Sequence, residues 1–195
     1  YGMVELPEGK MKSREGTVVD ADELLSSVIN EAKSLTSERG FLEELSQEDI
    51  LDICKKIGNS GLKYFLLKVD PRRKMSFNPK ETIDLSGHTG PFIQYTFVRI
   101  MSLLKKSEDL DNEFNIEDLK INSKELEVLK FISNFPDILG QSAKDLSPYL
   151  LANYLYSLVK SYNSFYQDHP IITEDNYDLR NFRVQMSKLV SEIIE

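Results

Sequence analysis

The chain has 195 residues, of which 41% are hydrophobic and 29% charged, and no apolar run approaches the roughly eighteen residues of a membrane helix, so we expect a soluble globular protein. The single cysteine, Cys54, excludes an internal disulfide and fits the reducing cytoplasm, and two histidines offer little for a histidine metal site or a Ser-His-Asp triad. The net charge of −8 argues against a generic nucleic-acid binder, which would be basic.

The chain opens with an apolar run that predicts a strand, followed by a short basic loop. The strand is expected over residues 1–6, and a second β-prone run lies at 17–19. Between them, residues 10–16 hold three cations in five positions and then a glycine, an arrangement that can stabilise charge on a leaving phosphate at the tip of a hairpin-like connection. Judged by spacing alone, such a loop is more often a solvated turn.

Short helices and one more strand are expected next. Asp20 is a candidate N-cap for a helix to about residue 37, and Ser46 with Asp49 three residues on predicts a second helix that ends near residue 57. The remaining elements expected in this part are a helix over 62–68, a strand over 74–78 and a helix over 79–85.

A basic tract occupies the middle of the chain. Between residues 72 and 106 there are seven basic side chains and two acidic ones. An acidic protein with one such tract can bind RNA on one face while the rest of its surface stays soluble. The basic residues of the tract are Arg72, Arg73, Lys74, Lys80, Arg99, Lys105 and Lys106.

A glycine-containing break near residues 85–89 predicts a boundary between a region over 1–86 and a helical domain over 87–195. Ser147 followed by Pro148 is a helix start signal within that domain. The fold class expected is mainly α, an antiparallel helix bundle preceded by a small α+β region. Its helices are expected over 89–107, 123–134, 136–145, 147–167 and 175–195, with a surface loop over 112–122.

The helix expected from residue 89 has two distinct faces. At 100° per residue, Ile93, Phe97, Ile100 and Leu104 form a core stripe. The opposite face interleaves aromatic and cationic side chains, which could stack on unpaired bases and contact phosphates. The alternative is that these aromatics pack against a neighbouring element. The residues of this face are Phe92, Tyr95, Arg99 and Lys106.

The helix expected from residue 147 carries a broad apolar stripe that is most simply core. Tyr156, Lys160 and Asn163 lie off this stripe, and Tyr166 lies at its edge near the helix end. The stripe itself consists of Leu151, Tyr154, Leu155, Leu158, Tyr162 and Phe165.

Four strings, in one order, resemble arginyl-tRNA synthetases, a family of class I aminoacyl-tRNA synthetases. Residues 9–19 (GKMKSREGTVV) resemble the KMSKS signature loop in its arginyl form, and 61–67 (GLKYFLL) resemble the family's ALRYFLL stretch. Residues 89–100 look like the start of its anticodon-binding domain, and 151–166 are similar to that domain's LANYLY…FNRFY helix. The resemblance implies that 1–86 end the catalytic domain with the signature loop and a stem-contact region, and that 87–195 form a DALR-type anticodon-binding domain.

For the signature loop, the resemblance implies contacts to ATP during adenylate formation. Lys10, Met11, Lys12 and Ser13 are the candidate ATP-binding residues. Lys10, Lys12 and Arg14 are the candidates for catalysis, because they would stabilise charge on the pyrophosphate. The second lysine of the signature is absent at its usual place, so either Lys12 or Arg14 could replace it.

For the helical domain, the resemblance implies contacts between aromatic and basic side chains and the anticodon. Phe92 replaces a tyrosine present in many relatives, so stacking can persist without a hydroxyl contact. The candidate tRNA-binding residues are Phe92, Tyr95, Arg99, Lys106 and Tyr166.

The implied reaction of the full enzyme joins L-arginine to its tRNA through an arginyl-adenylate, with ATP and Mg2+ as substrates. We expect a cytoplasmic monomer whose partner is the tRNA for arginine, with no membrane and no resident metal. The chain holds no HIGH-like motif or Rossmann strand series, and its last residues fall inside an apolar helical repeat. We therefore expect a fragment, truncated at its C-terminus, that is inactive alone and binds no cofactor.

Two alternatives remain open. The first is a non-catalytic helical module, related to anticodon-binding domains, that binds tRNA or a protein; residues 10–16 argue against it, because such a module has no use for an ATP loop. The second is another class I synthetase such as the cysteinyl enzyme, which the absence of zinc-type ligands and the Gln94-Tyr95-x-x-x-Arg99 string disfavour.

Overall fold

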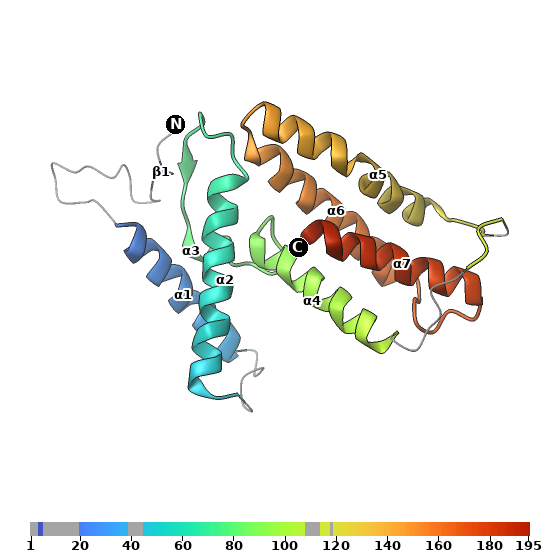
Figure 1. Cartoon of the computed structure of the whole chain (residues 1–195). Helices are drawn as coiled ribbons and strands as arrows, with labels where there is room; N and C mark the ends of the chain where they lie inside the picture. Colours follow the sequence, from blue (N-terminus) through green and yellow to red (C-terminus); the bar gives the residue numbers. More distant parts are fainter. Residues whose placement is uncertain (1–3, 6–19, 39–44, 108–113, 118) are drawn as a thin grey trace. The chain divides into compact units, whose positions relative to one another are not determined.

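The computed structural model describes residues 4–5, 20–38, 45–107, 114–117 and 119–195 (Figure 1). The chain divides into two compact units, residues 1–92 and 93–195. The sequence predicts a domain boundary between residues 86 and 87, whereas the division between the compact units falls within α4 (Gly90–Lys106). The exact domain boundary therefore remains a prediction.

The first unit is built on two packed helices, α1 (Ala21–Glu38) and α2 (Gln47–Leu67). Ser46 caps α2 as predicted, because its hydroxyl accepts a hydrogen bond from the backbone N–H of Asp49 at 3.1 Å. The prediction that α2 ends near residue 57 was wrong, since one helix runs through to Leu67. The core of the unit consists of Val28, Ala32, Ile50, Cys54, Phe77 and Ile83.

Two glycines of α2 lie in the segment between the two helices that were expected here, and they allow close packing. A Cβ at Gly58 would lie 2.7 Å from Ile29 Cγ1 of α1, and a Cβ at Gly61 would lie 2.9 Å from the carbonyl oxygen of Thr82. Both glycines lie inside the continuous helix α2, where each permits a close contact that a larger side chain would obstruct.

A small parallel sheet completes the described part of this unit. The strand β1 (Val4–Glu5) pairs with β2 (Met75–Ser76), with Val4 opposite Met75. The strand expected over 74–78 is thus confirmed. The helix expected over 79–85 is shorter than predicted: α3 (Pro79–Thr82) is one turn, capped by Asn78.

The second unit is a helix bundle, which confirms the expected fold class. It contains α4 after its first turn, α5 (Ser123–Lys144), α6 (Pro148–Asp168) and α7 (Tyr177–Ile194), and Figure 1 shows α5 and α6 running side by side in opposite directions. Its buried core consists of Ile100, Leu103, Val128, Tyr154, Leu158, Tyr162, Phe165, Ile171, Phe182, Val184, Met186 and Val190.

Two expectations for this bundle were wrong in detail. The helices expected over 123–134 and 136–145 are one helix, α5, with Pro136 in its interior; a proline removes one N–H but does not always end a helix. The core stripe of α4 is also rotated, because Thr96 and Leu103 are buried whereas Phe97 and Leu104 are half-buried. The start of α6 at Pro148 agrees with prediction, although the Ser147 hydroxyl donates to the carbonyl of Asp145 instead of capping the helix.

Candidate nucleic-acid interface

Three of the side chains predicted to contact tRNA meet between α4 and α6. The guanidinium of Arg99 lies over the ring of Tyr95, with its carbon 4.7 Å from the ring centroid, and over the ring of Tyr166 at 5.0 Å. Tyr95 and Arg99 are one helical turn apart on α4, and Tyr166 comes from the last turn of α6. We call these three residues the Tyr–Arg cluster.

The Tyr–Arg cluster is accessible on the surface of the second unit. Tyr95 is 49% exposed, and Arg99 and Tyr166 are half-buried. Aromatic rings that are partly exposed and ordered by a cation offer stacking faces to a flat ligand. Within the described residues no carboxylate forms an ion pair with Arg99, so its charge is left for a ligand.

Arg99 is held from beneath by Asn163, a residue that sequence analysis placed off the core stripe of α6. The structure corrects this placement, since Asn163 is only 8% exposed. Its side-chain oxygen accepts a hydrogen bond from Arg99 Nη1 at 2.5 Å, and its Nδ2 donates to the hydroxyl of the buried Thr96 at 2.7 Å. The stripe pattern missed it because a buried amide with two partners looks polar in sequence.

A buried tyrosine supports the cluster from the core side. The ring of Tyr162 lies 6.1 Å from the ring of Tyr166, centroid to centroid, and its hydroxyl donates to Ser187 Oγ at 2.9 Å. Burial raises the pKa of the Tyr162 hydroxyl well above its usual value. Tyr166 therefore packs against the ring of Tyr162, which burial and the hydrogen bond to Ser187 hold in place.

The other two predicted residues of this face, Phe92 and Lys106, lie at other positions along α4. Phe92 is half-buried and lies one turn before Tyr95 on α4. Lys106 is exposed in the last turn of α4, seven residues beyond Arg99 and so about 10 Å further along the helix axis. Contacts of Phe92, Lys106 and the cluster with tRNA stay predictions.

Part of the basic tract is engaged within the chain. The Arg72 side chain donates to both carboxylate oxygens of Asp70, from Nε at 3.0 Å and from Nη2 at 2.7 Å. The backbone N–H of Arg72 donates to the same carboxylate, and together these hydrogen bonds lower the pKa of Asp70 to about 2. Lys74 lies 3.6 Å from a carboxylate oxygen of Glu5. The tract is therefore less positive than its sequence suggests.

The predicted ATP loop lies outside the described residues. The residues concerned are Lys10, Met11, Lys12, Ser13 and Arg14. Their roles remain predictions. Among the described residues, no group of three or more His, Cys, Asp or Glu side chains is arranged to hold a metal ion. No helix of the described part is long and apolar enough to cross a membrane.

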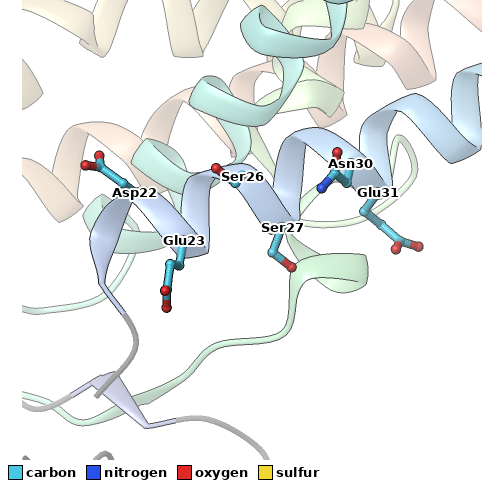
Figure 2. Close-up of a pocket in the computed structure, with 6 residues that line it drawn as sticks. All are labelled: Asp22, Glu23, Ser26, Ser27, Asn30 and Glu31. Atoms are coloured by element: carbon cyan, nitrogen blue, oxygen red, sulfur yellow. The ribbon is translucent and has the colours of Figure 1, made fainter. Parts of the chain in front are cut away.

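A surface hollow of about 600 Å³ lies along α1 in the first unit (Figure 2). Its lining gathers three carboxylates with hydroxyl and amide groups. Carboxylates repel phosphates, so this hollow does not suit ATP or RNA, and we assign it no role. The lining residues drawn are Asp22, Glu23, Ser26, Ser27, Asn30 and Glu31.

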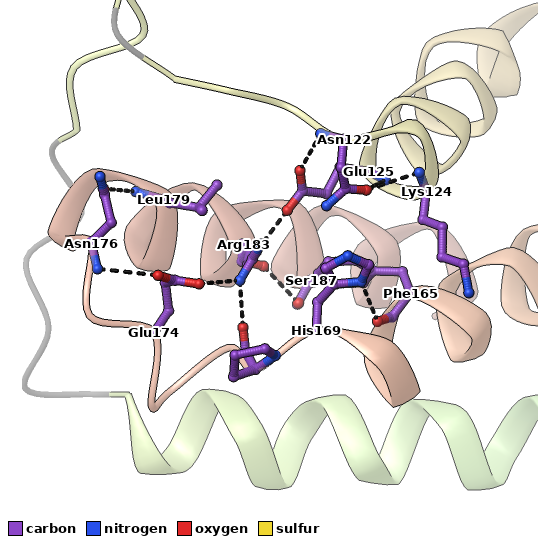
Figure 3. Close-up of polar contacts among 11 residues, drawn as sticks. Asn122, Lys124, Glu125, Phe165, His169, Glu174, Asn176, Leu179, Arg183 and Ser187 are labelled. Atoms are coloured by element: carbon purple, nitrogen blue, oxygen red, sulfur yellow. Dashed lines mark hydrogen bonds and ion pairs between the residues drawn. The ribbon is translucent and has the colours of Figure 1, made fainter.

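The second unit also contains a buried ion-pair network that the sequence pattern did not predict (Figure 3). Arg183 of α7 donates to Glu125 of α5 at 2.6 Å, to Glu174 at 2.6 Å and to the carbonyl of Pro170 at 2.7 Å. Glu125 also accepts from the backbone N–H of Asn122, which closes a capping box at the start of α5. The spacing Asn122-x-x-Glu125, which is typical of a capping box, was the one feature of the sequence that pointed to a role for Glu125.

The comparison with protein families identifies the helical unit. Residues 93–195 match the model of the DALR anticodon binding domain, which is more than half of the chain. The chain therefore belongs to the DALR anticodon-binding domain family. The matched residues coincide with the second compact unit, which contains the Tyr–Arg cluster.

Curated relatives extend the similarity over the whole chain. The chain is 48% identical to an arginine–tRNA ligase of Parabacteroides distasonis and 50% identical to one of Flavobacterium psychrophilum, in each case over 100% of its length. It covers 33% and 32% of these two proteins. The chain thus spans about a third of the length of the curated relatives it matches.

Solved structures agree on the fold. The arginyl-tRNA synthetase of Thermus thermophilus matches with a TM-score of 0.84 at 22% identity, and that of Plasmodium falciparum with 0.74 at 23% identity. Each match covers 100% of this chain and 32% of the other chain. At this level of identity the likeness concerns the fold alone.

Proposed function

We propose that this chain is the tRNA-binding part of an arginine–tRNA ligase, and that the Tyr–Arg cluster receives unpaired bases of the anticodon. The observation that carries the proposal is the meeting of Tyr95, Arg99 and Tyr166 within the matched anticodon-binding domain. The full-length similarity to arginine–tRNA ligases supports the choice of tRNA.

The chemistry of the cluster suits single-stranded RNA. An aromatic ring stacks on any base with about 1–3 kcal/mol per base, and a guanidinium adds charge attraction to the backbone or a further stacking plane. The overall charge of −8 opposes non-specific binding, so the affinity depends on this local arrangement.

We further propose that residues 10–16 act on ATP in the whole enzyme. The sequence of this loop supports the proposal through its resemblance to the signature loop: Lys10, Met11, Lys12 and Ser13 would bind ATP, while Lys10, Lys12 and Arg14 would stabilise pyrophosphate charge beside Mg2+. The reaction would form arginyl-adenylate and transfer arginine to tRNA in the cytoplasm.

The anticodon proposal is tested by filter binding of the chain to the tRNA for arginine at low salt. Tyr95→Ala and Arg99→Ala should each weaken binding about fivefold or more, because each removes a stacking partner. Tyr177→Ala is a matched control: Tyr177 is 45% exposed on α7 and lies 5.5 Å beneath Arg180, so it is a second Tyr–Arg pair outside the cluster. Equal losses in all three variants, or none in Tyr95→Ala and Arg99→Ala, would contradict the proposal.

The loop proposal requires the full-length enzyme. Lys10→Ala should lower the rate of ATP–pyrophosphate exchange by at least about tenfold while tRNA affinity stays nearly unchanged, since the lysine would act on charge that develops at the phosphates. An equal loss of both quantities would assign Lys10 to tRNA binding.

A further inference from the structure

Both polar atoms of the Asn163 amide form a hydrogen bond, although Asn163 is buried in α6 among mostly apolar side chains. Asn163 and Tyr166 are one turn apart on α6, and Thr96 and Arg99 are one turn apart on α4. The two pairs face each other, because Arg99 contacts both residues of α6 and Asn163 contacts both residues of α4. These contacts connect four side chains, Thr96, Arg99, Asn163 and Tyr166, across the interface between α4 and α6.

The chemistry of the partners fixes the orientation of this amide. A guanidinium has only donors, so the atom of Asn163 that faces Arg99 must be its oxygen. The nitrogen then faces Thr96, whose hydroxyl oxygen accepts its hydrogen bond. Thr96 is fully buried, so water cannot replace the hydrogen bond between Asn163 and Thr96.

Holding the guanidinium matters because arginine is otherwise a flexible side chain. Contact with two rings at once, at 4.7 and 5.0 Å, requires one rotamer out of many. A ligand that had to order Arg99 and both rings on arrival would bind less tightly than one that met them already ordered. A neutral amide orders the arginine without cancelling its charge, which a carboxylate at the same position would do.

We propose that Asn163 is a positioning residue that locks Arg99 against Tyr95 and Tyr166, so that the Tyr–Arg cluster is a preformed platform for one unpaired nucleobase. Thr96 sets the orientation of Asn163. This inference rests on the proposed function, and it concerns how the cluster is organised before RNA arrives.

The test is a double-mutant cycle between Asn163→Leu and Arg99→Ala. The RNA is the anticodon stem-loop of the tRNA for arginine, with the fluorescent base 2-aminopurine placed at each unpaired position in turn. Asn163→Leu keeps the side-chain size, removes both hydrogen bonds, and should weaken binding about tenfold. In the Arg99→Ala background the same change should weaken binding less than about twofold, because Asn163 acts through Arg99.

Stacking geometry gives a second readout that a loss of folded protein would not change. At saturating protein, the wild type should quench 2-aminopurine at one loop position, and Asn163→Leu should quench it less. Thr96→Ser, which keeps the hydroxyl, should retain the wild-type quenching, whereas Thr96→Val should resemble Asn163→Leu. Circular dichroism of each variant confirms that the chain is folded.

The outcomes separate the inference from the proposed function. If Arg99→Ala weakens binding but Asn163→Leu does not, or if the two effects add fully, the positioning role is wrong and the anticodon role stands. If quenching by Asn163→Leu at saturation equals that of the wild type, the platform does not depend on Asn163. If the wild type does not bind the stem-loop, both proposals fail.

Discussion

At the scale of single residues, Arg99 and Arg183 carry the same charge in the same unit but have opposite surroundings. Arg99 is half-buried and contacts an amide and two aromatic rings. The Arg183 side chain is 5% exposed and contacts two carboxylates, one of them with no exposed area. Among the described residues Arg99 has no acidic partner, whereas the charge of Arg183 is neutralised by carboxylates inside the protein.

The Arg183 network makes a direct stability prediction. Arg183→Met should lower the free energy of unfolding by about 3–5 kcal/mol, because the charge of Glu125 would remain buried without its partner. Arg183→Met combined with Glu125→Leu should recover a large part of this loss, since neither charge then remains. Urea unfolding followed by circular dichroism measures both.

Lys124→Met provides the control for Arg183→Met. Lys124 pairs with Asp168 at the surface and also donates to Ser164 Oγ at 2.8 Å. Solvent screens this pair, so its loss should be far smaller than that of Arg183→Met. Comparable losses would show that the buried network has no special role in stability.

At the scale of elements, the helix interiors show two kinds of glycine. Gly61 of α2 lies against the backbone of α3, and a Cβ there would meet the carbonyl oxygen of Thr82 at 2.9 Å. Gly140 of α5 has nothing within 4 Å of the place where a Cβ would lie. The first glycine is required by packing, and the second only weakens its helix.

These two glycines predict opposite effects of the same substitution. Gly61→Ala should lower the free energy of unfolding by roughly 1–3 kcal/mol, because the backbone of α3 must move. Gly140→Ala should raise it by about 0.5–1 kcal/mol through helix propensity alone. Urea unfolding of the two variants checks the signs; stabilisation by Gly61→Ala would mean that α2 and α3 are not tightly packed at this point.

At the scale of the whole molecule, charge is distributed so that only part of the surface suits RNA. The chain carries a net charge of −8, and within its basic tract Arg72 and Lys74 already have acidic partners. We expect RNA to bind near cations that have no such partner among the described residues. Arg99 and the exposed Lys106 at the end of α4 are the candidates along one helix.

The salt dependence of tRNA binding tests the role of Lys106. Each phosphate contact to single-stranded RNA contributes about 0.7 to the slope of log affinity against log salt concentration. Lys106→Ala should reduce the slope by about that amount, while Lys188→Ala, at an exposed position of α7, should leave it unchanged. Equal slopes for Lys106→Ala and the wild type would remove Lys106 from the interface.

Local signals in the sequence predicted much of the helical framework. The Ser46–Asp49 cap and Pro148 at the start of α6 were placed correctly, because cap and proline chemistry acts within one turn. The breaks expected between residues 57 and 62 and between residues 134 and 136 were wrong, since Gly58 and Gly61 make close contacts inside α2 and Pro136 lies inside α5.

The sequence by itself determined the mainly helical class, the order of the elements and, with the family resemblance that adds Tyr166, the candidate set Phe92, Tyr95, Arg99, Lys106 and Tyr166. These follow from periodicity, from caps and from motifs whose spacing is local. Only the tertiary structure decided that Arg99 contacts both tyrosine rings and donates a hydrogen bond to Asn163, and that Arg183 forms a buried ion pair with Glu125. The physical reason is that a side chain's partner 58 or 64 residues away is set by helix packing, which no local pattern encodes.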